Sequence, residues 1–144
     1  MKRSTFVTLA LICTLFIAGC TLGFKSWPEP TDTHDTFSWR SITGSFSGDC
    51  LLIEGRLQGA FQNLDVVYLQ IEILGDGSCG ECPFKPDRTL EFRSGAAGFE
   101  HIGLWMKIQV CSVDTTVPHR IRLIGTSKLT GLADVPSDII RIDP

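Results

Sequence analysis

The chain has 144 residues with 13 basic and 16 acidic side chains, a formal net charge of −3 at pH 7. A mildly acidic protein has no general attraction to nucleic acid or to an anionic lipid surface, so this balance argues against a nucleic-acid partner. The length suits one domain after a leader segment and leaves no room for a second domain.

The first twenty residues have the features of a secretory signal. Lys2 and Arg3 precede a mostly apolar run over residues 6–18, and small residues separate this run from Cys20. The run is shorter than the roughly 20 apolar residues that a membrane-spanning helix needs. We therefore expect a cleaved signal peptide over residues 1–19.

The Ile-Ala-Gly-Cys sequence that ends at Cys20 resembles the lipobox of bacterial lipoproteins, whose signal peptidase cuts before a lipidated cysteine. The resemblance implies that Cys20 becomes the acylated (palmitate-type) first residue of the mature protein. It also implies a cell outer membrane anchor facing the periplasm, because Thr21 stands where aspartate would favour the inner membrane. The mature chain, with 11 basic and 16 acidic side chains, would then contact the membrane through the lipid on Cys20 and not through a basic patch.

Residues 20–35 are expected to form a flexible tether. Pro28 and Pro30 disfavour helix and bias their neighbours towards extended backbone. The segment would act as a spacer between the lipid anchor and the domain that follows.

From residue 36 to residue 144, apolar side chains recur at every second position, and turn-forming residues recur every eight to twelve positions. This pattern is typical of strands in an all-β sandwich or barrel. We predict a single antiparallel β-sandwich of about seven strands. The predicted strands centre on residues 37–39, 51–57, 67–73, 90–92, 105–110, 120–123 and 139–142.

The end of the chain has an alternating strand at 119–127, a loop containing Gly131, a Pro136-Ser137 turn and a last strand at 139–142. This arrangement resembles the final two strands of a fibronectin type III domain. Upstream, the tryptophan expected on the second strand is missing, and His119 or Val117 replaces the aromatic residue before the penultimate strand. The resemblance implies an interaction module more than an enzyme.

Four cysteines remain after Cys13 in the signal and Cys20 in the anchor, and an oxidising compartment favours two disulfides, with three possible connectivities. Cys50 and Cys111 share the outward phase of their strands. In a fibronectin-like order those strands are antiparallel neighbours, which predicts a disulfide between Cys50 and Cys111. Cys79 and Cys82 then pair by elimination.

The Cys79-Gly80-Glu81-Cys82 segment has two other interpretations. A thiol-redox pair usually sits at a helix N-terminus, and Pro83 and Pro86 disfavour a helix there. A structural zinc would need two further ligands, which could come from Cys50, Cys111 or His101. We expect a local disulfide with no metal and no cofactor, and we keep the redox and metal-binding roles as the alternative.

No constellation of catalytic residues is evident in the sequence. Gly75, Gly77 and Gly80 match a GxGxxG pattern but precede no helix, and the Gly44 to Gly48 segment has Phe46 where a nucleophilic serine would stand. His34, His101 and His119 are expected to have surface or capping roles, and the aspartates beside turns to have backbone roles. We therefore expect a protein that is not an enzyme.

Two features are candidates for binding. Trp105 lies on the outward phase of its strand, where it could anchor a partner, although a neighbouring strand, the disulfide or the tether could cover it. Arg120, Arg122 and Arg141 would line an outward face of the last strands. The sequence thus predicts a membrane-anchored lipoprotein of the cell envelope that acts as a non-catalytic binding or structural module for an envelope protein partner.

Overall fold

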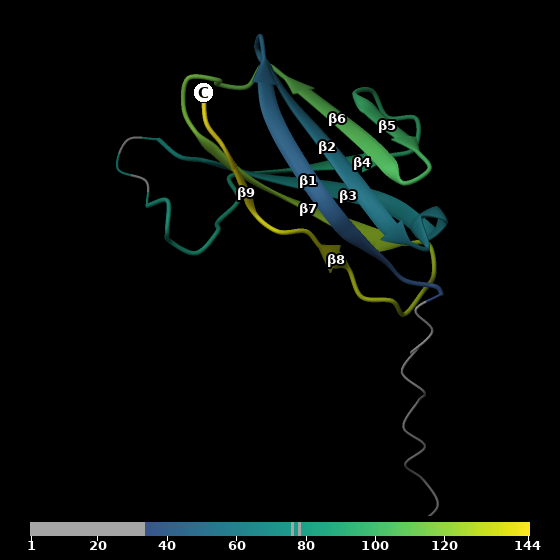
Figure 1. Ribbon diagram of the computed structural model, residues 1–144. Helices are drawn as coiled ribbons and strands as arrows, with labels where there is room; N and C mark the ends of the chain where they lie inside the picture. Colours follow the sequence, from purple (N-terminus) through teal and green to yellow (C-terminus); the bar gives the residue numbers. More distant parts are fainter. Residues whose placement is uncertain (1–33, 76, 78) are drawn as a thin grey trace, which may run out of the picture. The chain divides into compact units, whose positions relative to one another are not determined.

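The computed structural model describes residues 34–75, 77 and 79–144. The predicted signal peptide, Cys20 and nearly all of the predicted tether lie outside these residues. Within the described part of the chain, no helix is long and apolar enough to cross a membrane. The described residues form two facing antiparallel sheets, which confirms the predicted all-β sandwich (Figure 1).

The first sheet has four strands. They are β1 (Phe37–Ser47), β2 (Cys50–Gly59), β6 (Trp105–Cys111) and β5 (Phe99–Ile102), in the spatial order β1-β2-β6-β5. The short 3-10 helix η2 (Phe61–Asn63) follows β2, where the chain crosses to the other sheet.

The second sheet has five strands. They are β4 (Arg88–Arg93), β3 (Leu64–Ile73), β7 (His119–Ser127), β8 (Val135–Pro136) and β9 (Ile140–Ile142); the order is β4-β3-β7-β8, and β9 also pairs with β7. The two sheet orders correspond to the ABED and CFG sheets of immunoglobulin-type sandwiches, with β4 added beside β3. The described chain thus has nine strands where the sequence predicted about seven, because β5 and β8 were not anticipated.

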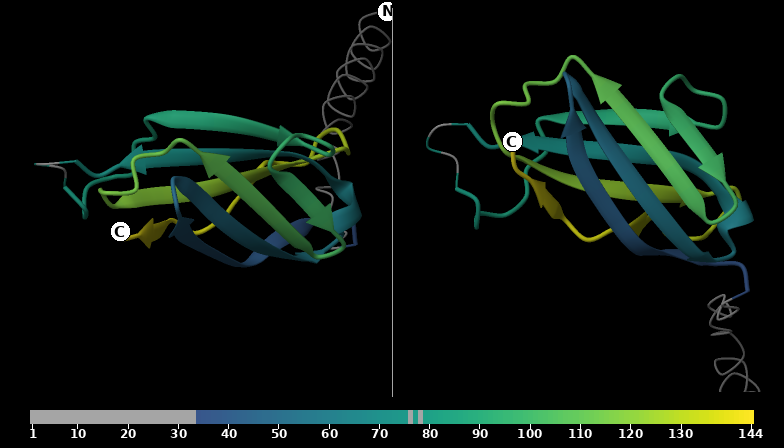
Figure 2. Two further views of the ribbon diagram at one scale, coloured as in Figure 1. Left: turned by 90° about the horizontal axis from the view of Figure 1, so that it is seen from above. Right: turned by 45° about the horizontal axis from the view of Figure 1, so that its top comes forward.

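Figure 2 shows the two sheets as facing layers, and the core side chains come from both of them. Inward side chains at alternate positions of the strands are almost completely excluded from solvent, as the period of two predicts. The most buried are Leu51, Ile53, Leu57, Val67, Leu69, Ile71, Ile108, Ile121 and Leu123. Gly55 takes an inward place on β2 because a Cβ there would come within 2.8 Å of the Met106 Cγ.

Trp39 joins the two sheets at one edge. Its indole Nε1 donates a hydrogen bond to the Val135 carbonyl oxygen at 2.8 Å, which ties β1 to β8. The register of β1 against β2 shifts between Trp39 and Ser41, so Trp39 faces the core while Ser41 and Thr43 face outward. A tryptophan on the first strand therefore contributes to the core, although the second strand has none.

His119 contradicts the predicted surface or capping role. Only 1% of the residue is exposed, and it shares the inward phase of β7 with Ile121. Its Nδ1 lies 2.9 Å from the Val117 carbonyl oxygen, and its ring meets Phe46 edge-on at 5.2 Å. The side chain is buried because one ring nitrogen has a backbone partner and the rest of the ring packs against aromatic surface.

Candidate binding face around Trp105

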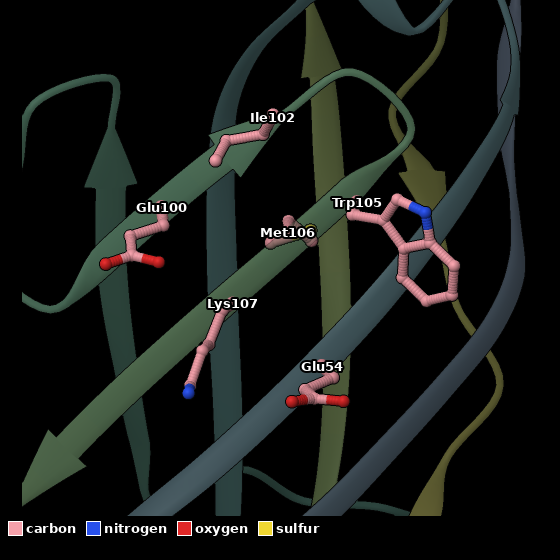
Figure 3. A pocket seen from close by; sticks show the side chains of 6 residues that line it. All are labelled: Glu54, Glu100, Ile102, Trp105, Met106 and Lys107. Carbon is pink, nitrogen blue, oxygen red and sulfur yellow. The ribbon is translucent and has the colours of Figure 1, made fainter.

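Strand pairing assembles a row of outward side chains across the first sheet. Arg56 on β2 is opposite Trp105 on β6, which is opposite Ile102 on β5. The next outward row places Lys107 opposite both Glu54 and Glu100. Residues more than 40 positions apart in the chain thus share one surface, shown in Figure 3.

Trp105 is exposed, as its strand phase predicted. Its side chain is 55% accessible, and Ile102 beside it is 76% accessible. The Arg56 guanidinium carbon lies 4.9 Å from the centroid of the indole, which is a cation–π contact with one face of the ring. No described strand covers the rest of the indole.

The charged row beside Trp105 has no ion pair in the part of the chain that the structure describes. Lys107 projects from β6 between Glu100 on β5 and Glu54 on β2 (Figure 3). No salt bridge forms among these three side chains within the described residues, although strand register makes them neighbours. Their hydrogen-bonding capacity is therefore open to a ligand.

Three shallow hollows run side by side on this face. The central one, about 160 Å³, is lined by Glu54, Glu100, Ile102, Trp105, Met106 and Lys107. A second of about 290 Å³ shares Glu100 and Lys107 with it, and a third of about 230 Å³ shares Glu54 and continues to Thr43 and Ser45 on β1. The shared residues make the hollows one extended surface from β1 to β5.

The Cys50–Cys111 disulfide lies at one end of the same face. The two cysteines are directly opposite in the β2–β6 register and are bonded in the structure, as predicted. The Gln109 amide nitrogen lies 3.4 Å from the Cys111 Sγ and 3.6 Å from the Cys50 Sγ. Asp49 is near both sulfurs, but sulfurs joined in a disulfide supply no thiolate for a metal ion.

The predicted arginine patch on the other sheet is not an open surface. Arg120 is only 8% exposed and forms a salt bridge to Glu72, and Arg122 donates to the Gln70 side chain. Arg141 is exposed and pairs with Asp143. The alternation of residues along β7 predicts only that Arg120 points outward. It does not predict that the β3–β4 loop packs against β7 and covers Arg120.

The Cys79–Cys82 disulfide is also present, in the loop between β3 and β4. Both cysteines are exposed, and the loop contains no helix at this point. The zinc alternative is not supported, because Cys50 and Cys111 are bonded to each other on the first sheet and His101 lies on β5 of that sheet. The structure therefore does not assemble the four zinc ligands.

A separate cleft of about 480 Å³, which the sequence did not predict, lies near η2 and the edge strands. Its lining includes Phe61, Arg93, Phe99, His101 and Lys128. The His101 Nε2 is buried there and has no hydrogen-bond partner among the residues that the structure describes. Burial lowers the pKa of His101 and the nearby Lys128 charge lowers it further, whereas a backbone hydrogen bond with Gly103 acts against both.

Neither a protein-family model nor a curated protein matches the sequence. A DUF3823 family protein from Bacteroides ovatus has a similar structure, with a TM-score of 0.50 and 10% identity over 74% of this chain and 55% of that one. A candidate carbohydrate-binding protein from Bacteroides uniformis gives a TM-score of 0.47 and 9% identity over 75% of this chain and 57% of that one. This chain thus spans a little over half the length of each, and the likeness to the first is one of fold alone.

Proposed function

We propose that this protein is a non-catalytic binding module of the cell envelope that holds a glycan chain on the outer face of its first sheet. The observation that carries the proposal is the exposed indole of Trp105 beside three charged side chains that have no ion pair among the described residues. The lipid on Cys20, predicted from the sequence, would hold this face close to envelope glycans.

The chemistry of the face suits a polyhydroxylated ligand. The apolar C–H face of a sugar ring packs on an open aromatic ring, and Trp105 has one face free of Arg56. Sugar hydroxyl groups donate hydrogen bonds to carboxylates such as Glu54 and Glu100, and they accept hydrogen bonds from the Lys107 ammonium. The three groups therefore complement the mixed donors and acceptors of a sugar.

The shape of the face favours an extended chain. An enclosed cavity of several hundred cubic ångströms is typical of small-molecule sites, whereas the hollows here are shallow, continuous and open. A linear oligosaccharide lying from β1 to β5 would contact all three.

The test is binding of the full-length protein, in detergent, to soluble oligosaccharides of N-acetylglucosamine, glucose and xylose by isothermal titration calorimetry. We expect at least one series to bind, with affinity rising with chain length, and Trp105→Ala to weaken it about tenfold or more. Leu129→Ala is the matched control, because Leu129 is an exposed apolar residue (41%) after β7 on the other sheet.

A second arm tests the polar groups and the absence of catalysis. Glu54→Gln and Glu100→Gln should each weaken binding several-fold, because each removes a charged acceptor. The bound oligosaccharide should remain uncleaved after prolonged incubation. Absence of glycan binding together with Trp105-dependent capture of an envelope protein would contradict the proposed ligand, and cleavage would contradict the non-catalytic role.

A further inference from the structure

The β3–β4 loop is fixed at its base on the second sheet. The Leu74 amide donates to the Pro118 carbonyl at 2.8 Å, and the Asp87 amide donates to the Ile71 carbonyl at 2.8 Å. The Asp87 carboxylate also accepts from the Ile73 amide. Figure 1 shows the loop at the end of the sandwich that also holds the C-terminus.

We call residues 79–82 the tip of this loop. Among the described residues, Arg120 is the only residue of the two sheets whose side chain is hydrogen-bonded to the tip. Its Nη1 donates to the Gly80 carbonyl oxygen at 2.9 Å and to the Cys82 carbonyl oxygen at 2.8 Å. Its Nε and Nη2 meet the Glu72 carboxylate at 2.8 and 2.6 Å. The guanidinium is thereby held by β3 and presents its remaining edge to the loop.

Phe84 completes the contact between the loop and β7. Its ring lies 5.8 Å from the Arg120 guanidinium carbon and 5.1 Å from that of Arg122. These are cation–π distances, so the phenyl ring covers both arginines. Arg120 occupies an outward position on β7 but is only 8% exposed, because the loop tip and Phe84 cover it.

The disulfide gives the tip the shape that this contact requires. The Gly80 and Cys82 carbonyl oxygens must both reach the Arg120 Nη1, so the backbone must turn between them. The Cys79–Cys82 bond closes this turn covalently. The only backbone hydrogen bond that closes it, among the described residues, is the 3.2 Å contact from the Cys82 amide to the Cys79 carbonyl. Without the covalent closure, more conformations compete with the bound one.

The two disulfides of the domain differ in accessibility. Cys79 and Cys82 are both exposed. In the other disulfide Cys111 is exposed but Cys50 is buried, and the Gln109 amide nitrogen lies near both sulfurs. Thiol–disulfide exchange needs direct approach of a thiolate to a sulfur, so access decides which bond reacts. In the Cys79–Cys82 bond, an incoming thiolate can attack either sulfur.

We infer that Cys79–Cys82 is a thiol–disulfide exchange site for a dithiol protein, and that its reduction releases the loop tip and uncovers Arg120 and Arg122. A thiolate of the dithiol protein attacks one sulfur, forms a mixed disulfide and expels the other cysteine as a thiolate. The second thiolate of the dithiol protein then attacks the mixed disulfide. The dithiol protein leaves with its own disulfide, two electrons have reached this chain, and Cys79 and Cys82 each take a proton from water.

The test uses the full-length protein and dithiothreitol as the dithiol. Iodoacetamide trapping followed by mass spectrometry should show Cys79 and Cys82 alkylated before Cys50 and Cys111. At that point, hydrogen exchange of the amides of residues 80, 81, 82 and 84 should be about tenfold faster or more, with β3 and β7 amides unchanged. Simultaneous reduction of both disulfides, or an unchanged exchange rate at the tip, would overturn the inference.

Variants separate the disulfide from the arginine contact. Cys79→Ser with Cys82→Ser should give the fast tip exchange without reductant, whereas Cys50→Ser with Cys111→Ser should leave tip exchange slow. Phe84→Ala should accelerate tip exchange with the disulfide intact. Arg120→Lys should do the same, because different nitrogens of the Arg120 guanidinium reach Glu72 and the two carbonyls, whereas the three donors of lysine lie on one nitrogen. A tip that stays protected in the Cys79→Ser/Cys82→Ser protein would refute the role given to this disulfide.

Discussion

His101 is a half-buried histidine whose protonation opposes folding. It faces inward on β5, with Phe99 and Phe61 rings 6.5 Å from its own. Burial lowers its pKa from the ordinary value of 6.5, so the unfolded chain takes up this proton before the folded domain does. Folding stability is therefore complete above about pH 6.5 and falls as the pH drops towards the lowered pKa of the folded state.

This gives a prediction for the pH dependence of stability. The urea midpoint of the wild-type protein should fall between about pH 7 and about pH 5, and His101→Gln should reduce that fall, because one such proton contributes at most about 1.4 kcal/mol per pH unit. His34→Gln is the control, since His34 is exposed. Equal pH dependence in wild type and His101→Gln would show that His101 does not contribute.

Single residues also show where sequence reasoning ends. The outward phase of Trp105 followed from alternation along its own strand. Its neighbours Glu54 and Glu100 did not, because only strand register, set by the whole sheet, places them beside it. His119 was misjudged because a polar residue at a strand start looks solvent-exposed until the backbone carbonyl that pairs with it is known.

At the scale of elements, long strands were predictable and short ones were not. The ten-residue β3 strand has alternating inward and outward residues over positions 67–72, whereas β5 has four residues in all and β8 has two. Two residues cannot establish a period, and β8 forms because it pairs with β7 and accepts the Trp39 hydrogen bond. The β3–β4 loop was also unpredictable, because its position depends on Arg120 some 40 residues later.

The two disulfides should stabilise the domain unequally. Cys50–Cys111 links residues 61 positions apart, and Cys79–Cys82 links residues three apart. The chain-entropy treatment gives about 4 kcal/mol for the long loop and about 2 kcal/mol for the short one. Urea unfolding of each double Cys→Ser protein should show a much larger loss of unfolding free energy for Cys50→Ser/Cys111→Ser, and equal losses would contradict this entropic ranking.

At the scale of the described domain, the outer faces of the two sheets have opposite characters. The first presents an exposed tryptophan and charged side chains with no ion pairs among themselves in the described part of the chain, whereas on the second Arg120 and Arg122 are paired and covered. The outer face of the first sheet is uncovered and is suited to binding a ligand. On the second sheet, an exposed disulfide holds the β3–β4 loop over the arginines, and this arrangement is suited to opening on reduction. The two proposals thus concern different sheets and fail or hold independently.

Membrane attachment is the prediction that concerns the whole protein. Acyl chains contribute about 0.8 kcal/mol per buried CH₂, and stable anchoring needs more than one chain, as the proposed lipidation of Cys20 would supply. Cys20→Ser should therefore move the exported protein from the detergent phase to the aqueous phase in phase partitioning. Cys79→Ser/Cys82→Ser is the control, because it removes cysteines without removing the proposed anchor. A Cys20→Ser protein that stays in the detergent phase would refute the lipid anchor. Anchoring also raises the effective concentration of a weakly binding face at the membrane. The released protein should therefore bind soluble oligosaccharide normally but retain less glycan in envelope fractions.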